Sequence, residues 1–178
     1  MAADKLLNKI NNIRIWQRGD TRAPHKPLLL LYTLARLSRD EPRLMSYEEI
    51  REDLRKLLIE FGPFRRTHYP NYPFVKLCND GDFWEIKGDI DIDTTEDWSE
   101  RELIDNHTFG GFTEETYTLL KNDSKLFRKL ARIILDQYFD ETLQQDILAQ
   151  VGLGLESDTR LVRCPEFRNR VLRAYEYR

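Results

Sequence analysis

The sequence predicts a mainly helical α+β domain, and three observations lead to this class. Apolar residues recur at helical spacing along most of the 178-residue chain. Two Ser-x-x-Glu capping boxes mark helix starts at Ser46 and Ser99. The clearest strand-like stretches, rich in aromatic and apolar residues, lie between Tyr72 and Lys87. Together these patterns favour one helical core with a small β element.

Three helices are predicted before the strands. Residues 4–16 carry an apolar stripe that ends near Trp16. Residues 28–37 are apolar nearly all round, which is typical of a helix buried on every side. A third helix is expected over 46–61, because Gly62-Pro63 ends the helical pattern there.

A β-hairpin is predicted next. Tyr72–Cys78 and Asp82–Lys87 have strand-like composition, and Asn79-Asp80-Gly81 between them is a typical hairpin turn. Three helices followed by a hairpin are typical of winged-helix DNA-binding domains. A capped helix over 99–105 and a loop over 106–112 are expected to follow. The remaining helices are predicted over 114–121, 125–139 and 141–151.

The predicted domain covers residues 1–151, and residues 152–178 are interpreted as a linker and a basic helix. Gly152–Thr159 has the composition of a linker. Pro165 then opens a basic amphipathic segment that runs to Tyr177.

Charge is distributed unevenly along the chain, although the formal net charge is only −3. Residues 1–76 carry a net +6, residues 77–123 carry −11, and residues 124–178 carry +2. A local basic field attracts a polyanion even when the total charge is unfavourable. The first part of the chain is therefore the expected site for a nucleic acid.

The segment RRTHYPNYPFVK, residues 65–76, concentrates this basic character and contains no acid. Arg65 and Arg66 suit phosphate or a base edge, and Tyr69 offers a flat face with a polar tip. The prolines restrict the backbone before binding and so reduce its entropic cost. A proline-rich structural turn is the alternative interpretation of the same residues.

Other chemistry finds little support in the sequence. The three histidines, His25, His68 and His107, lie in separate loops without the close pairing of a metal site, so neither a metal nor a cofactor is predicted. Cys78 and Cys164 are expected to be free thiols in a reducing cytoplasm, because no secretory signal precedes them. A membrane partner is not expected, because the longest apolar runs fall well below the roughly 18 residues of a membrane span.

Four motifs resemble the sulfur-binding domain of phosphorothioate-dependent, McrA-like type IV restriction endonucleases. They are PHKPLLLLYTLARL (24–37), FGPFRRTHYPNYPFVKL (61–77), NDGDFWEI (79–86) and NHTFGGF (106–112). The resemblance covers nearly the whole chain. The closing residues, RCPEFRNRVLRAYEYR (163–178), resemble the segment that leads into an HNH nuclease domain in longer family members.

The resemblance implies binding to double-stranded DNA in which sulfur replaces a non-bridging phosphate oxygen. It also implies a shallow nonpolar pocket for the sulfur, formed by the loop at His107–Gly111 and a nearby basic side chain. The family commonly has proline where this chain has Thr108. The resulting candidate DNA and sulfur contacts are His25, Lys26, Arg65, Arg66, His68, Tyr69, Lys76, His107, Thr108, Gly110 and Gly111.

The expected function is therefore recognition of phosphorothioate DNA without catalysis, in a protein whose fused HNH nuclease would cut the modified DNA. A homodimer is also considered. The alternative is a winged-helix-like regulatory or interaction module that binds unmodified nucleic acid or a protein. A small hydrolase is disfavoured, because no nucleophile, base and orienting group can be assembled from the motifs.

Overall fold

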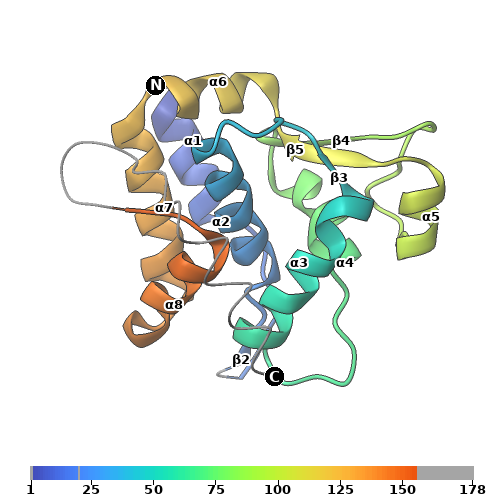
Figure 1. Ribbon diagram of the computed structural model, residues 1–178, viewed down its shortest axis with the longest axis horizontal. Helices are drawn as coiled ribbons and strands as arrows, with labels where there is room; N and C mark the ends of the chain where they lie inside the picture. The colour runs from blue at the N-terminus through green and yellow to red at the C-terminus, as the bar shows by residue number, and fades with distance from the viewer. Residues whose placement is uncertain (1, 20, 156–178) are drawn as a thin grey trace.

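Figure 1 shows the computed structural model of the protein, which describes residues 2–19 and 21–155. The described helices are α1 (Ala2–Asn11), α2 (His25–Ser38), α3 (Tyr47–Phe61), α4 (Asn71–Lys76), the 3-10 helix η1 (Leu77–Asp80), α5 (Glu100–Asp105), α6 (Glu114–Asn122), α7 (Ser124–Tyr138) and α8 (Glu141–Val151). The described strands are β1 (Gln17–Arg18), β2 (Thr21–Arg22), β3 (Met45–Ser46), β4 (Trp84–Lys87) and β5 (Phe109–Phe112). The predicted mainly helical α+β class is confirmed.

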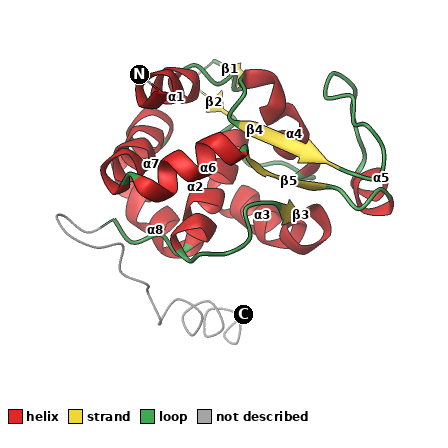
Figure 2. Cartoon of the chain, turned by 90° about the horizontal axis from the view of Figure 1, so that it is seen from above, coloured by secondary structure: helices red, strands yellow, loops and turns green. Residues whose placement is uncertain are grey.

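Helix α2 is the centre of the core, as its apolar sequence predicted. Leu28 through Leu31 are fully buried, and α2 packs against α3, α4, α6, α7 and α8. The helix begins at His25, so Pro27 lies in the first turn, where its missing N–H costs no hydrogen bond. Figure 2 shows α7 and α8 on one side of this helix and the sheet with α5 on the other.

A three-stranded antiparallel sheet in the order β3-β5-β4 packs beside the helices (Figure 1). Its centre is β5, in which Gly110 and Gly111 are both buried. A Cβ on Gly111 would lie 2.2 Å from the carbonyl oxygen of Arg43, and one on Gly110 would lie 2.7 Å from the ring of Phe74. Both glycines are therefore needed for close packing of the sheet.

The predicted hairpin is wrong. Tyr72–Cys78 does not form a strand, because its residues belong to α4 and η1. Asn79 and Asp80 lie in η1, and Gly81 follows it with a φ of 155°. The predicted second strand does form as β4, but its partner is β5, with Trp84 opposite Phe112. The described residues therefore do not form the predicted winged-helix hairpin.

Several helix ends differ from the predicted ones. Helix α1 ends at Asn11, and the chain then leads through an exposed Trp16 into the small β1–β2 hairpin. Ser46 precedes α3 but makes no side-chain capping hydrogen bond, so the capping box predicted there is wrong, and the backbone of Ser46 pairs with Phe109 in the sheet. Ser99 does form the predicted capping box with Glu102. The 106–112 segment, predicted as a loop, contributes β5.

Helix α8 ends at Gly152, which has a φ of 76°, and Leu153 is buried beyond it. Arg39 donates hydrogen bonds to the carbonyls of Val151 and Gly152, so the start of the predicted linker is fixed to the core. The predicted basic segment, 165–177, lies outside the described residues. Within the described chain, no helix combines the length and apolar character that crossing a bilayer requires.

Candidate functional site

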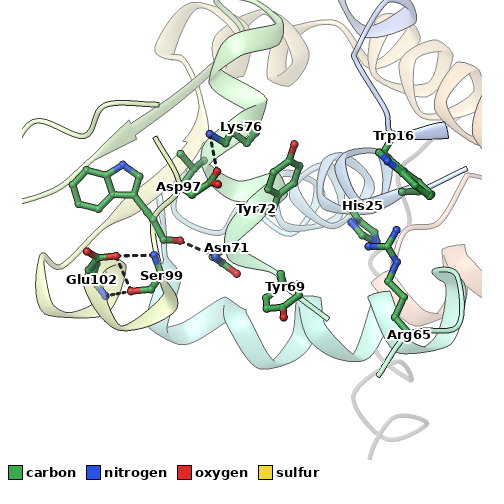
Figure 3. Close-up of a pocket in the computed structure, with 13 residues that line it drawn as sticks. Trp16, His25, Arg65, Tyr69, Asn71, Tyr72, Lys76, Asp97, Ser99 and Glu102 are labelled. Atoms are coloured by element: carbon green, nitrogen blue, oxygen red, sulfur yellow. Dashed lines mark hydrogen bonds and ion pairs between the residues drawn. The ribbon is translucent and has the colours of Figure 1, made fainter. Parts of the chain in front are cut away.

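A groove of about 640 Å³ opens between three segments that are distant in sequence. The connection between α1 and α2 supplies Trp16 and Ala23, the first residue of α2 supplies His25, and the loop after α3 supplies Arg65. The far side comes from the residues around the start of α5. Helix α4 and the turn before it lie between them, as Figure 3 shows. The residues from α4 and its preceding turn are Tyr69, Asn71, Tyr72, Val75 and Lys76, and those of the far side are Asp97, Trp98, Ser99 and Glu102.

Aromatic rings and aliphatic groups form much of the groove surface. Tyr69 and Tyr72 are about half exposed, with relative accessibilities of 55% and 51%. Their three-residue spacing around a helix start places both on one side of the turn. Pro70 precedes α4 with a φ of −65°, a value already suited to a helix, so the tyrosines are held on a stiff backbone. Val75 is buried beneath them.

Arg65 lies over the ring of Trp16, with 5.0 Å between its guanidinium carbon and the ring centroid. The arginine is exposed, and the indole is 49% exposed. This contact joins the loop after α3 to the connection that follows α1 (Figure 3). The pair places a permanent positive charge at one edge of the groove, whose far side carries the acids Asp97 and Glu102.

Lys76 lines the opposite part of the groove, but its ammonium is already engaged. It donates hydrogen bonds to the carbonyls of Thr94, Thr95 and Glu96, the shortest at 2.7 Å, and forms an ion pair with Asp97 at 3.1 Å. Lys76, one of the predicted DNA contacts, thus clamps an acidic loop in this structure. Arg65 keeps the more available charge.

The groove is also polar beneath its surface. Burial, together with the charges of Arg65 and His68, lowers the pKa of His25 to about 4, so the imidazole is neutral at neutral pH. The His25 Nε2, the His68 Nδ1 and the Asn71 Oδ1 are buried without a hydrogen-bond partner among the described residues. The Asn71 amide nitrogen donates to the carbonyl of Trp98 at 2.7 Å and fixes α4 to the far wall. Three polar atoms near the groove are therefore buried and unpaired within the described part of the chain.

Lys26 does not reach the groove surface. It is 8% exposed, and its ammonium lies 2.5 Å from a carboxylate oxygen of Asp80. The other oxygen of Asp80 accepts the backbone N–H of Arg14 at 3.1 Å. Lys26 therefore ties the start of α2 to η1, which is a structural role.

The segment His107–Gly111 does not line the groove. His107 is exposed with a φ of 45°, and its Nδ1 lies 2.6 Å from Asp89, which raises its pKa. Thr108 is 2% exposed, its hydroxyl has no partner among the described residues, and its N–H donates to the carbonyl of Leu103. Gly110 and Gly111 are buried in β5. Thr108 and the two glycines therefore contact other parts of the protein and are covered from solvent.

Of the eleven predicted contacts, the structure brings His25, Arg65, Tyr69 and Lys76 together around the groove. His68 is half-buried near His25, and Arg66 is exposed beside Arg65. The sequence analysis missed Trp16, Tyr72 and Trp98. Trp16 was assigned to a helical stripe, although the Gln-Arg-Gly-Asp turn after it was a sign that the helix ends earlier.

The arrangement is suited to binding rather than to a reaction. It combines exposed aromatic faces with one stacked guanidinium, which together favour an anion with a polarisable, weakly hydrated part. Among the described residues, no group of three or more His, Cys, Asp or Glu side chains is placed to hold a metal ion.

Comparison with known proteins gives one family match. The model of the ScoMcrA-like DNA sulfur-binding domain matches residues 3–156. No curated protein sequence matches the chain.

Solved structures with a similar fold include the sulfur binding domain of SprMcrA complexed with phosphorothioated DNA, with a TM-score of 0.72 and 20% identity, covering 84% of this chain and 93% of that one. The sulfur binding domain of ScoMcrA complexed with phosphorothioated DNA has a TM-score of 0.66 and 20% identity, covering 79% and 93%. The type IV phosphorothioation-dependent restriction endonuclease ScoMcrA has a TM-score of 0.63 and 20% identity, covering 82% of this chain and 32% of that one.

Proposed function

Because the chain belongs to the ScoMcrA-like DNA sulfur-binding domain family, we propose that it binds double-stranded DNA carrying a phosphorothioate linkage. The groove beside Arg65 is the proposed binding site. The observation that carries this assignment is the combination of half-exposed tyrosine rings with a single available guanidinium at the groove edge. An ordinary phosphate site would present several donors instead.

The aromatic surface gives the site a reason to prefer sulfur. A phosphate oxygen placed against carbon atoms loses hydrogen bonds to water, at a cost of about 1–3 kcal/mol. Sulfur is a weaker hydrogen-bond acceptor and more polarisable, so it loses less hydration and gains dispersion energy against the rings of Tyr69 and Tyr72. Each difference of about 1.4 kcal/mol changes affinity tenfold. One contact of this kind therefore gives measurable discrimination.

Charge provides the remaining affinity. Arg65 and Arg66 are exposed on the loop after α3, and Arg14 and Arg18 are exposed on either side of Trp16 in the chain. These side chains belong to the basic part of the sequence and are suited to phosphates that flank the modified linkage. We place the sulfur contact in this groove rather than at His107–Gly111, because Thr108, Gly110 and Gly111 are buried.

We also propose that the domain directs a fused HNH nuclease to modified DNA and does not itself cut DNA. The closing segment, 163–178, supports this proposal through its resemblance to the sequence that precedes such a nuclease. Incubation of the purified chain with modified duplex and divalent ions is expected to leave the DNA intact. The homodimer considered from the sequence stays a prediction, which sedimentation with and without DNA would test.

Fluorescence anisotropy with two otherwise identical duplexes tests the binding proposal. One duplex carries a single stereodefined phosphorothioate and the other carries none. The modified duplex should bind more tightly, both affinities should fall as salt rises, and Tyr69→Ala should bring the two affinities closer together. Arg132→Ala, which removes an exposed charge from α7, is the matched surface control.

Equal affinities of the unaltered chain for the two duplexes would contradict the proposal. Such a result would favour the generic nucleic-acid interaction module considered from the sequence. A preference that survives Tyr69→Ala and Tyr72→Ala would instead move the sulfur contact out of the groove.

A further inference from the structure

Arg65 and Arg66 are adjacent arginines with different surroundings. Both are exposed on the loop after α3. Arg65 stacks on Trp16, whereas Arg66 has no aromatic, ion-pair or hydrogen-bond partner among the described residues. Arg65 also lines the groove and Arg66 does not. The difference between the two side chains is therefore the indole that one of them covers.

The backbone of Trp16 is tied to the residues just before α2. Its carbonyl accepts the N–H of Ala23 at 2.9 Å, directly beside the β1–β2 pair in which Gln17 faces Arg22. The indole lines the groove and is 49% exposed, so an apolar ring faces solvent there. Its exposed ring is explained if the ring has a task at the groove.

Stacking suits an arginine that must still bind an anion. The guanidinium is planar, and a ring below it leaves the N–H groups at its edge free to form paired hydrogen bonds with phosphate or a base. Stacking also limits the number of side-chain conformations before DNA arrives, which reduces the entropy lost on binding. No described acid forms an ion pair with Arg65 that would have to be broken first.

We propose that Trp16 is a positioning residue for DNA binding: it holds Arg65 at the groove edge in the orientation that engages the DNA backbone. This inference rests on the proposed function. It assigns to Trp16 an effect on affinity that acts through Arg65 and not through a contact of its own.

A double-mutant cycle separates these two routes. Affinity is measured by anisotropy on modified and unmodified duplexes for the unaltered chain, Trp16→Ala, Arg65→Ala and the double variant. Trp16→Ala should weaken binding about two- to tenfold. Because it acts through Arg65, Trp16→Ala should have little further effect in the Arg65→Ala background. Trp16→Phe, which keeps an aromatic face, should restore most of the affinity.

Arg66 supplies the matched control, because Trp16→Ala and Arg66→Ala should add independently. Loss of Arg65 or of Trp16 should also flatten the dependence of affinity on salt by a similar amount. A purely structural role of Trp16 would instead lower the melting temperature and leave the salt slope unchanged.

The inference is overturned if Trp16→Ala costs as much without Arg65 as with it, because the indole would then contact DNA directly. It is also overturned if Trp16→Ala binds like the unaltered chain, or if no duplex binds at all. The function has a separate readout. If the effects of Trp16→Ala and Arg65→Ala are coupled but both duplexes bind equally well, the role of Trp16 stands and sulfur recognition is refuted. If the two effects are independent but the modified duplex binds more tightly, sulfur recognition stands and the role of Trp16 is refuted.

Discussion

Replacement of Lys26 by methionine should destabilise the fold and leave the DNA-binding surface in place. The ammonium of Lys26 and the carboxylate of Asp80 form a pair in which the side chains are only 10% and 1% exposed. Methionine keeps the length and most of the volume of lysine but leaves the Asp80 carboxylate with the Arg14 N–H as its remaining partner among the described residues. A buried carboxylate is then left without a compensating charge.

Breaking a buried pair of this kind costs about 3–5 kcal/mol. In a chain of this size, each kcal/mol lowers the melting temperature by about 2–4 °C. The expected loss is therefore roughly 6–20 °C. The double variant Lys26→Met with Asp80→Asn should recover much of it, because no unpaired charge remains and the asparagine oxygen still accepts the Arg14 N–H.

Thermal unfolding followed by circular dichroism measures the effect, and Lys9→Met is the control. Lys9 pairs with Asp82, but these side chains are 36% and 83% exposed, so its loss should change stability by at most about 1 kcal/mol. A Lys26→Met melting temperature equal to that of the unaltered chain would refute the structural role. A stable, folded Lys26→Met protein that no longer binds DNA would support the direct contact predicted from the sequence.

Three further predictions concern stability. The folded pKa of His25 is about 4 and its ordinary value is 6.5, so its contribution of up to about 3 kcal/mol to the free energy of unfolding is present above pH 6.5 and is lost as pH falls toward 4. In urea unfolding measured across this pH range, His25→Gln should reduce the dependence of stability on pH. The same pH dependence in the variant would argue against the prediction. Gly111→Ala, with a Cβ 2.2 Å from the Arg43 carbonyl oxygen, should lower the free energy of unfolding in urea by about 1–3 kcal/mol, while the folded fraction keeps its sulfur preference. Loss of that preference at full stability would restore Gly111 to the sulfur site. Thr108→Val should leave the free energy of unfolding unchanged or raise it by up to about 1 kcal/mol, because it removes a buried hydroxyl that has no partner among the described residues. Thr108→Pro should destabilise the fold by removing the hydrogen bond from the Thr108 N–H to the Leu103 carbonyl, and similar melting curves for the two variants would contradict this.

The helical part of the fold was accessible from the sequence because its signals are local. The apolar residues of α2 predicted the central helix, and Ser99 with Glu102 predicted the start of α5. Each of these signals depends on side chains only a few residues apart, so no knowledge of the rest of the chain was needed.

The sheet was predicted incorrectly because strand pairing is not local. Tyr72–Cys78 has the aromatic and apolar composition of a strand, yet Pro70 and Pro73 suit the first turn of a helix, and α4 forms there. The true partner of β4 is β5, which begins only at Phe109, with α5 between the two strands in the chain. Nothing in the residues near Trp84 identifies that partner.

The groove was predicted only in part for the same reason. Arg65 and Tyr69 stood out because they share one basic segment. Trp16 and Trp98 come from remote segments, and only the folded chain brings them to the same groove. Lys26 and Lys76 looked available because a sequence shows charge but not the acids and carbonyls that neutralise it in the fold.

The clamp that Lys76 places on residues 94–97 has a consequence for how a duplex would lie across the protein. It holds the carboxylate of Asp97 on one border of the groove, where Glu102 also lines the wall, on the far side from Arg65. A row of phosphates running along that border would meet like charge, so we expect the sugar-phosphate chain to follow the arginine side and the exocyclic amino groups of the bases to face the acids. The basic and acidic borders would then allow only one orientation of the duplex on the domain. In the opposite orientation, the phosphates would face the acids and the amino groups of the bases would face Arg65.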